Sequence, residues 1–386
     1  MLQTVLLWAA TISFVLALYA GASVMIGWRR LQQLKAAPAR HSAALPPLVS
    51  IIIAARNEER DIEAALSSLL AQDYPGLEFI VIDDRSTDQT GAILDRMTRA
   101  DKRLHVVHRT ELPAGWLGKT YALYTGAKRA HGSILLFTDA DVCMQPSTVA
   151  RAVNFMESRA VDHLTVLPQL TPRSRWLKAL IACFTIVFML YARPWKARDH
   201  RSSAHVGVGA FNMVRRKAYE TAGTHHAIAM RPDDDLKLGK MLKKAGFRAD
   251  VLVGEDLVWL EWYPSWTAMR EGLMKNAFAG LEYSFTVLVL LSVLVLGVFV
   301  MPFVALALTQ GIALYVNIAT VVFLCLLYAG TVRAVGLRYW YGPLLPAVML
   351  VFLYICWRAA LLVLVNDGID WRGTHYPLAS LRANKV

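Results

Sequence analysis

Charged side chains are scarce in this sequence, and two long stretches have none. Only 18% of the 386 residues are charged, whereas 56% are hydrophobic, and this balance argues against a wholly soluble, disordered or fibrous protein. No charged residue occurs within 1–28 or within 284–332. Because about 20 apolar residues in a helix cross the hydrocarbon core of a bilayer, both stretches predict membrane-spanning helices.

The sequence also lacks a cysteine framework and a basic stretch interleaved with aromatic residues. Its cysteines, Cys143, Cys183, Cys325 and Cys356, are too widely spaced for a zinc site or a disulfide-stapled domain, which fits a reducing compartment or burial in lipid. In so apolar a chain, the net charge of +12 is best assigned to contacts with anionic lipid and phosphates. We expect the lipid bilayer as a partner and no nucleic acid.

The first apolar stretch is predicted to be an uncleaved anchor. A signal peptide carries basic residues before its apolar run and a small-residue cleavage site after it. Here the basic residues Arg29, Arg30 and Lys35 follow the run instead. We therefore assign 1–28 to a transmembrane anchor and 29–47 to a basic linker. Because positive charge marks the cytoplasmic side, we expect an integral protein of the cell inner membrane whose next domain is cytoplasmic.

The C-terminal part, 284–366, is predicted to form about three membrane helices. Two fit into the uncharged stretch with a turn near 309–311, and a third over 339–357 is interrupted by Arg358. Whether the third segment spans the membrane fully stays open at this point. Residues 367–386 are expected to form a tail.

Between these membrane segments, residues 48–276 have the pattern of an α/β domain. Apolar runs typical of buried strands alternate with stretches of helical spacing, which implies crossover connections and a mostly parallel sheet. In such sheets ligands lie outside the carboxyl ends of the strands. The expected strands are 48–54, 78–82, 104–108 and 134–137, and the expected helices are 57–70 and 90–99.

One apolar run inside this domain, 179–192, is 14 residues long, which is short for a span. Trp176, Tyr191 and Trp195 near its ends favour a helix over 176–195 that lies in the membrane interface. A buried core helix is the alternative.

Acidic residues follow two of the predicted strands, and a third acidic cluster precedes a helical stretch. Asp139 and Asp141 come at the end of a strand, where a turn can bring both carboxylates onto one hard cation such as Mg²⁺ or Mn²⁺. Aspartate is also common in turns for local hydrogen-bonding reasons. Asp83 and Asp84 end an earlier strand and can accept hydrogen bonds from a base N–H or from ribose hydroxyls, or else belong to a turn that opens the next helix.

The third acidic cluster is Asp233, Asp234 and Asp235, which precedes a stretch of helical spacing. Three adjacent carboxylates repel one another, which raises the pKa of at least one of them and suits a general base. Capping of the following helix is the alternative reading. Both roles can apply, with one residue capping and another facing the cleft.

Six segments, in this order over about residues 48–276, resemble the motifs of family 2 glycosyltransferases. They are Ala-Arg-Asn-Glu-Glu at 55–59, Val-Ile-Asp-Asp-Arg-Ser-Thr-Asp at 81–88, Gly-Lys at 118–119, Asp-Ala-Asp at 139–141, Gly-Ala-Phe-Asn-Met-Val-Arg-Arg at 209–216, and the acidic segment 234–246. A subgroup is indicated by Leu-Pro-Ala-Gly-Trp-Leu-Gly-Lys at 112–119. It is similar to membrane enzymes that glycosylate carotenoids or hopanoids, and more distantly to ceramide glucosyltransferases.

The resemblance implies a GT-A fold, a nucleotide-sugar donor (a UDP-sugar is expected), a divalent metal and inversion at the anomeric carbon. By motif, Asp235 is the expected general base, preferred to Asp234 because its spacing to Gly246 matches the family. Asp141 is the expected metal ligand, with Asp139 beside it.

The resemblance also places further residues around the donor and the acceptor. Asp84, with Asp83 second, is expected at the nucleoside, and Lys119 beside the diphosphate as a point charge. The expected donor-binding set is Glu58, Asp83, Asp84, Lys119 and Asp139. The expected sugar or acceptor pocket contains Trp116, Phe211 and Asn212, although packing is an equal alternative for Trp116.

The chain departs from the family after the predicted base. Processive and ceramide-type members carry a Gln-x-x-Arg-Trp signature there, and this sequence has none. In the corresponding stretch, 266–276, Arg270 and Lys275 are expected either to neutralise the leaving diphosphate or to lie among lipid headgroups.

Together these features predict an inverting, metal-dependent hexosyltransferase that moves a sugar to a hydroxyl or carboxylate of a membrane lipid, of carotenoid, hopanoid or sphingolipid type. One alternative is a processive polysaccharide synthase, which would need a translocation channel. The other is a non-catalytic membrane protein with a degenerate transferase domain. The sequence names neither the sugar nor the lipid.

Overall fold

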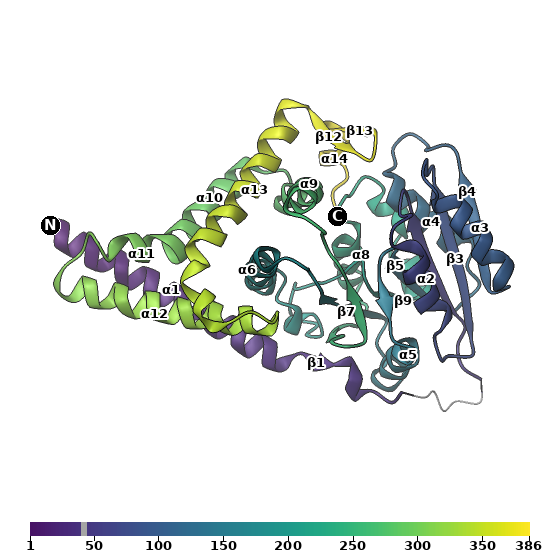
Figure 1. The fold of residues 1–386 in the computed structure, drawn as a ribbon, viewed down its shortest axis with the longest axis horizontal. Helices are drawn as coiled ribbons and strands as arrows, with labels where there is room; N and C mark the ends of the chain where they lie inside the picture. The colour runs from purple at the N-terminus through teal and green to yellow at the C-terminus, as the bar shows by residue number, and fades with distance from the viewer. Residues whose placement is uncertain (40–44) are drawn as a thin grey trace. The chain divides into compact units, whose positions relative to one another are not determined.

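The computed structural model describes residues 1–39 and 45–386 and divides the chain into two compact units (Figure 1). The sheet unit comprises Leu31–Leu170, Pro194–Glu261 and Ala379–Val386. The helical unit comprises Met1–Arg30, Thr171–Arg193 and Trp262–Leu378. The stretch 171–193 and residues 262–276, which the sequence placed inside one domain with 48–170, thus pack with the apolar helices.

The sheet unit is built on one large, mostly parallel sheet, as the sequence predicts. Within the described residues its strand order is β1-β10-β7-β9-β5-β2-β3-β4, and only β9 is antiparallel to its neighbours β5 and β7. The strands are β1 (Gln32–Gln33), β2 (Val49–Ala55), β3 (Leu77–Asp84), β4 (Leu104–Arg109), β5 (Ile134–Asp139), β7 (His163–Leu167), β9 (Asn212–Arg215) and β10 (Ala249–Val253).

Helices pack on this sheet through apolar faces. One core cluster joins Ile52 and Ile82 of the sheet to Leu123 and Leu238 of two helices, each at most 3% exposed. Burying such side chains contributes about 1.5–3 kcal/mol each. The helices are α2 (Ile62–Leu70), α3 (Thr90–Ala100), α4 (Gly118–Arg129), α5 (Thr148–Arg159), α7 (Arg216–Thr221) and α8 (Asp234–Lys244), with a 3₁₀ turn η3 (His225–Ile228).

One expected helix begins later than the sequence suggested. The spacing predicted a helix from residue 57, but α2 starts at Ile62. Asn57 has a left-handed backbone, with φ of 55°, and its side-chain oxygen accepts a 2.8 Å hydrogen bond from the Thr87 N–H. The segment before α2 is therefore a loop tied to the loop that follows β3.

Smaller strands complete the fold. A three-stranded sheet has the order β6 (Cys143–Met144), β11 (Val258–Leu260), β8 (Gln169–Leu170). In the helical unit, β12 (Gly368–Trp371) and β13 (Thr374–Pro377) form an antiparallel hairpin. The short helix α14 (Leu378–Ala383) follows it, so the predicted tail is structured.

The helical unit contains the long apolar segments. Its described helices include α1 (Leu2–Arg30), α6 (Arg175–Ala192), α9 (Trp266–Ala277), α10 (Phe285–Val295), the π-helical η5 (Leu296–Val300), α11 (Met301–Ala305), α12 (Gly311–Ala334), the 3₁₀ helix η6 (Tyr339–Leu344) and α13 (Leu345–Val365). In the described residues, five helical segments are long and apolar enough to cross a membrane: 2–30, 175–196, 285–305, 311–334 and 339–365.

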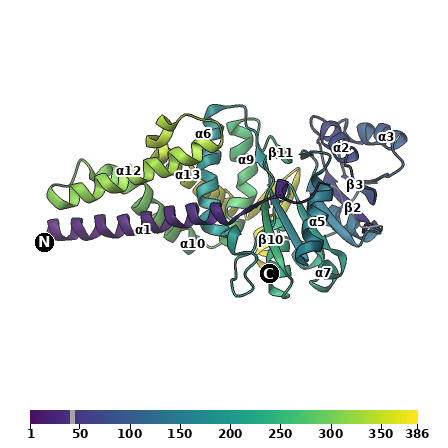
Figure 2. The same cartoon turned by 90° about the horizontal axis from the view of Figure 1, so that it is seen from below.

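The segment 175–196 was not expected to be long enough to cross a membrane. The apolar run 179–192 looked short for a span, but α6 extends over Arg175–Ala192 because its first turn accommodates Arg175, Trp176 and Lys178. Viewed along its axis in Figure 1, and upright in Figure 2, α6 runs across the direction of α1 and α12 in the same unit.

Candidate active site

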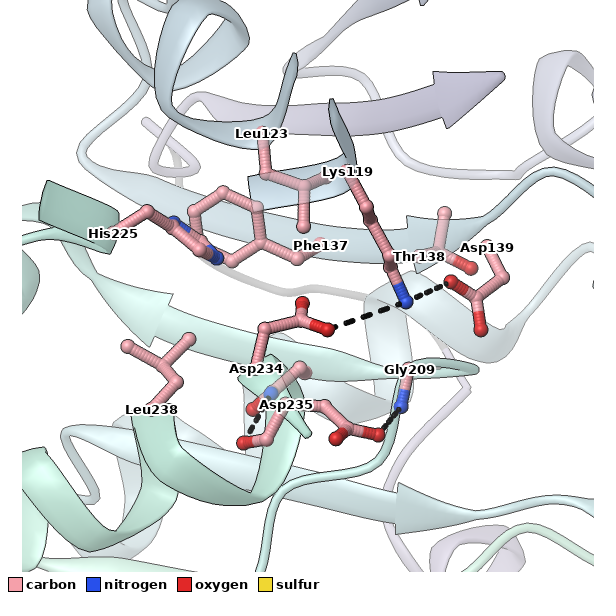
Figure 3. Close-up of a pocket in the computed structure, with 11 residues that line it drawn as sticks. Lys119, Leu123, Phe137, Thr138, Asp139, Gly209, His225, Asp234, Asp235 and Leu238 are labelled. Atoms are coloured by element: carbon pink, nitrogen blue, oxygen red, sulfur yellow. Dashed lines mark hydrogen bonds and ion pairs between the residues drawn. The ribbon is translucent and has the colours of Figure 1, made fainter. Parts of the chain in front are cut away.

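The acidic residues singled out in the sequence gather where β5 ends and where α4 and α8 begin. Asp139 is the last residue of β5, Lys119 lies in the first turn of α4, and Asp234 opens α8. A pocket lies between them (Figure 3). It is lined by Lys119, Leu123, Phe137, Thr138, Asp139, Gly209, Asn212, His225, Asp234, Asp235 and Leu238.

Lys119 is the cationic centre of this pocket. Its Nζ lies 2.7 Å from Asp139 Oδ1 and 3.8 Å from Asp234 Oδ1. Burial disfavours the charged ammonium, but the attraction of Asp139, Asp234 and Asp235 outweighs it and raises the pKa of Lys119 above its ordinary value. The lysine therefore stays protonated where it can meet a phosphate or a carboxylate.

Asp235 is held from both of its oxygens by backbone N–H groups. Oδ2 accepts a 2.8 Å hydrogen bond from Gly209, and Oδ1 accepts a 2.7 Å bond from Leu236. Burial, and next the charge of Asp139, raise the pKa of this carboxyl, while Lys119 and the two N–H groups pull it down. A carboxylate with a raised pKa and a fixed position is suited to accept a proton near neutral pH.

The loop opposite α8 comes close only because its residues are small. A Cβ on Gly207 would lie 1.8 Å from the Asp235 carbonyl oxygen, and a Cβ on Gly209 would lie 2.4 Å from Asp139 Oδ2. The Gly209 carbonyl also accepts a 2.9 Å hydrogen bond from the Asp139 N–H. The glycine loop thus joins Asp139 and Asp235 through one residue.

Asp233 does not share the surroundings of its two neighbours. The guanidinium of Arg231 holds it in a two-pronged pair at 2.9 and 3.0 Å, and Lys237 Nζ lies 3.5 Å away. Asp233 and Arg231 are 6% and 1% exposed. Asp233 is therefore part of a buried ion pair at the start of α8, while Asp234 and Asp235 face the pocket.

Asp141 lies among like charges beside this pocket. Burial, then the charges of Asp139 and Glu58, raise the pKa of Asp141 to about 7. Among residues 1–39 and 45–386, no three His, Cys, Asp or Glu side chains are gathered into a ready-made metal centre. Mg²⁺ and Mn²⁺ are often held by one or two carboxylates together with substrate phosphates, and a cation would relieve this repulsion. The residues present fit such an ion.

The two aspartates at the end of β3 differ sharply. Arg85 pairs with both oxygens of Asp84 at 3.0 and 2.8 Å, and Arg109 and Arg56 approach to 3.5 and 3.9 Å. Asp84, expected foremost at the nucleoside, is therefore enclosed by arginines.

Asp83 keeps one buried oxygen without a hydrogen-bond partner among the described residues. Its Oδ2 lies 2.8 Å from His108 Nδ1, and this hydrogen bond, assisted by Asp95, raises the pKa of His108 despite burial. Within the described part of the chain no donor reaches Asp83 Oδ1, although the residue is only 6% exposed. Of the pair, Asp83 has the free acceptor.

Trp116 stands in a cluster of aromatic rings. It stacks on Tyr124 with centroids 5.0 Å apart and meets Tyr121 and His226 edge-on at 5.1 and 5.6 Å. These contacts give Trp116 a packing role and at the same time form a flat, partly exposed aromatic surface next to the first turn of α4.

The other residues expected at the sugar or acceptor pocket lie deeper. Asn212 lines the pocket, donates a 3.4 Å hydrogen bond to the Asp235 carbonyl and contacts the buried His163. Phe211 is completely buried and is not among the lining residues. It supports the glycine loop from behind.

Two predicted cations belong to the other unit. Arg270 and Lys275 lie on α9, where Arg270 Nη2 is 3.5 Å from Glu271 and Lys275 Nζ lies 3.9 Å above the Trp371 ring. The structure therefore shows them in contacts within the helical unit. It does not gather them with the residues of the pocket.

One set of contacts that positions α4 could not be predicted from the sequence. The Ala229 carbonyl accepts hydrogen bonds from the Leu117 N–H and the Thr120 hydroxyl, at 2.9 and 2.6 Å, and so fixes the start of α4. From the tail, Asn384 donates to the Ala227 carbonyl and accepts from the Met230 N–H, both at 2.9 Å. A lone asparagine far along the chain carries no motif that would reveal this contact.

Comparison with known proteins agrees with this geometry. The sequence profile of Glycosyl transferase family 2 matches residues 50–223. These residues are thus similar in sequence to a family 2 glycosyltransferase domain. The fold resembles that of the mannosyltransferase PcManGT from Pyrobaculum calidifontis, solved in complex with GDP-Man and Mn²⁺, with a TM-score of 0.55 and 20% identity over 94% of this chain and 99% of that one. The predicted GT-A-like fold is confirmed.

Two relatives carry a specific name. A 4,4'-diaponeurosporenoate glycosyltransferase of Staphylococcus haemolyticus is 26% identical over 236 residues, 60% of this chain and 61% of its own. The Staphylococcus aureus protein of that name is 24% identical over 277 residues, 71% of each chain. An uncharacterized glycosyltransferase of Haemophilus influenzae is 35% identical over 121 residues, 31% of this chain and 36% of its own. The chain thus spans less than two thirds of the length of the Haemophilus influenzae and Staphylococcus haemolyticus relatives. The two relatives named for 4,4'-diaponeurosporenoate match the suspected resemblance to carotenoid-associated members of family 2.

Proposed function

We propose that this protein is an inverting glycosyltransferase of the inner membrane that transfers a sugar from a nucleotide-sugar donor, on the cytoplasmic side, to a membrane lipid. The observation that carries the proposal is the placement of Asp235, a carboxylate of raised pKa fixed by Gly209 and facing the ion pair of Lys119 and Asp139. The relatives named for a carotenoid acid support a lipid-type acceptor.

In this proposal each group near the pocket has one task. Asp235 takes the proton of the acceptor hydroxyl as its oxygen attacks the anomeric carbon, so that no alkoxide has to form in advance. Asp83, through its open oxygen, and Lys119, through its charge, hold the nucleoside and the diphosphate of the donor. Asp84 orders the arginines beside them.

Asp141, with Asp139, would hold a divalent ion, which when bound neutralises charge on the departing diphosphate. A fixed positive charge where negative charge develops lowers the barrier most. Lys119, already protonated and 2.7 Å from Asp139, serves the same end from the protein itself. Arg270 and Lys275 are not needed for this scheme.

The alternatives have less support. A processive synthase is expected to carry the Gln-x-x-Arg-Trp signature, which the sequence lacks. A degenerate domain would have lost acidic residues, whereas Asp139, Asp141, Asp234 and Asp235 are all in place around the pocket.

The test uses the full-length protein in lipid nanodiscs with a panel of UDP- and GDP-sugars and a total lipid extract. We expect one donor to give a lipid product whose mass is increased by one sugar residue, and loss of that product on adding EDTA. Donor binding without any glycosylated lipid would overturn the lipid acceptor, and product formation unaffected by EDTA would overturn the metal.

A further inference from the structure

Pairing between strands fixes the side of the membrane on which α6 begins and ends. The chain enters α6 from β7 and β8 and leaves it toward β9. β7 and β9 are neighbours in one sheet, with Leu164 opposite Met213. Between these strands, α6 is the one described segment long and apolar enough to cross a membrane. A crossing by α6 would separate two hydrogen-bonded strands by a bilayer, so α6 must return to the side it came from.

The tail imposes the same condition on the C-terminal helices. Residues Ala379–Val386 belong to the sheet unit, where Asn384 bonds to Ala227 and Met230 and Val386 packs against the core cluster. The described segments of spanning length between Glu261 and this tail are 285–305, 311–334 and 339–365. Three crossings would leave the tail on the wrong side. An even number is required.

Contacts within the helical unit identify the pair that crosses. α12 packs on α1, where a Cβ on Gly21 would touch the Phe323 ring, and Ser13 of α1 donates a 2.7 Å hydrogen bond to the Gly297 carbonyl of η5. The α10–α11 segment and α12, which the uncharged loop 306–310 joins, run antiparallel to each other, and α1 packs beside both in one bundle.

α13 packs against α6 and against α10. Its Met349 lies 3.6 Å from Cys183 of α6, and its Trp357 donates a 2.9 Å hydrogen bond to Ser292 and meets Phe285, the first residue of α10. It also carries Arg358, whose guanidinium lies 3.8 Å from Met274 of α9. A charge within a helix that crosses the hydrocarbon core is costly. The contact with α9 instead places Arg358 near the start of α10, where the chain enters the bundle.

We infer that α1, α10–α11 and α12 cross the bilayer, and that α6 and α13 are embedded without crossing it, in the leaflet on the side of the sheet unit. Tyr328 of α12 fixes α6 at this level through a 2.6 Å hydrogen bond to the Ala179 carbonyl. The orientation of α6 across α1 and α12 agrees (Figures 1 and 2). Trp176 and Tyr191 of α6, 41% and 53% exposed, and Tyr354 of α13, 49% exposed, then face lipids of that leaflet near its surface, where aromatic rings are favoured.

The experiment determines on which side of the membrane a segment lies. It uses single added cysteines and a membrane-impermeant maleimide, in intact and in permeabilised cells. Four small, exposed positions suit it: Ser203→Cys marks the sheet unit, Ala307→Cys the loop 306–310, Ser174→Cys the start of α6 and Ser380→Cys the tail. The unmodified protein measures background labelling of the native cysteines. Gel filtration in detergent shows whether each variant is folded, and Ala383→Cys replaces Ser380→Cys if that variant is not.

We expect Ser174→Cys and Ser380→Cys to label on the same side as Ser203→Cys, and Ala307→Cys to label on the other side. Labelling of Ser380→Cys together with Ala307→Cys would show that α13 crosses and would overturn the inference. Labelling of Ser174→Cys on the side opposite Ser203→Cys would overturn it for α6, and labelling of all four on one side would overturn the crossing bundle. The readout needs no transfer activity, so its failure and a failure of the proposed function are distinguishable.

Discussion

Two clusters of aspartate at the edge of the same sheet have opposite surroundings. At the end of β3, Asp84 is surrounded by Arg56, Arg85 and Arg109, so cations outnumber the carboxylate. At the start of α8, Asp234 and Asp235 share the cation Lys119 with Asp139. An aspartate with excess positive charge around it serves as an anchor. Asp235, which shares Lys119 with two other carboxylates, keeps a raised pKa and remains available for proton transfer.

The triplet at α8 contains the same contrast within three residues. Asp233 pairs with Arg231 and Lys237, whereas both oxygens of Asp235 accept hydrogen bonds from neutral N–H groups. Because consecutive residues on a helix point about 100° apart, adjacent carboxylates can face a buried cation and an open pocket. Separate substitutions of Asp233 and Asp235 can therefore distinguish the anchoring role from the role in the pocket, which the sequence alone does not distinguish.

The largest effect is expected for Asp235→Asn. The amide keeps the size but cannot take a proton, so transfer to a hydroxyl acceptor should fall by about 10²–10⁴-fold, with donor affinity within a few-fold of wild type. Transfer assays and donor titrations measure both. Asp234→Asn is the matched control, with an intermediate loss of transfer. If Asp234→Asn is inactive while Asp235→Asn turns over normally, the base has been assigned to the wrong residue.

The same variant reports the acceptor class. A carboxylic acid ionises near pH 4, about as the side chain of aspartate does, so a carboxylate acceptor needs no base at neutral pH. Asp235→Asn should then retain most activity toward a carotenoid acid while losing activity toward a polyisoprenoid alcohol. Equal losses with both acceptors would contradict proton removal as the task of Asp235.

The next largest effect concerns stability. Asp233→Asn leaves Arg231 without its charged partner in a buried site, and breaking such a pair typically costs about 3–5 kcal/mol. We expect a marked fall in the thermal unfolding midpoint of the detergent-solubilised protein. Asp101→Asn is the control, because Asp101 also pairs with an arginine two residues away but at the surface, where a pair contributes about 0–1 kcal/mol. Equal destabilisation by both variants would refute the anchor role.

Lys119→Gln removes the cation that Asp139, Asp234 and Asp235 share. Loss of a charged hydrogen bond to the diphosphate should weaken donor binding by about 10- to 100-fold. Lys119 also lowers the pKa of Asp235, so its removal raises that pKa further, and the acid limb of the pH–rate profile should move to higher pH. Lys128→Gln, on the exposed face of the same helix, should change neither quantity. An unshifted profile would show that Lys119 does not act on the base.

The smallest effect is expected for Asn384→Ala. Without its two hydrogen bonds, the segment 227–230 loosens, and with it the Ala229 carbonyl that fixes the start of α4. We expect kcat to fall several-fold at unchanged thermal stability, with Lys385→Ala as a silent neighbour. A fall in stability without a change in kcat would mean that Asn384 has only a structural role.

How far the sequence predicts this protein depends on the range of the contacts involved. The strand runs 48–54 and 134–137 follow from local patterns, and β2 and β5 bear them out; Asp139, which follows the second run, lines the pocket. The difference between Asp83 and Asp84 cannot be predicted from local patterns, because it arises from contacts with Arg56, Arg109 and His108, which lie in other segments of the chain.

The same distinction between local patterns and long-range contacts applies to the membrane segments. Apolarity and length predicted the helices over 1–28 and 284–332. The start of α6 at Arg175 could not be read from the apolar run 179–192, because charged residues in its first turn interrupt the hydropathy pattern without interrupting the helix. That α6 packs with α12 and α13 depends on contacts such as Tyr328 with Ala179 and Cys183 with Met349.

Gly209 acts as a spacer of fixed length between the two halves of the proposed reaction. Its carbonyl holds the backbone of Asp139 and its N–H holds the side chain of Asp235, at 2.9 and 2.8 Å. A single residue therefore sets the separation between the proposed place of the leaving group and the proposed place of the proton acceptor. Acceptors of different chain length must present their reactive oxygen at this one separation, so discrimination among them has to come from surfaces beyond the glycine loop.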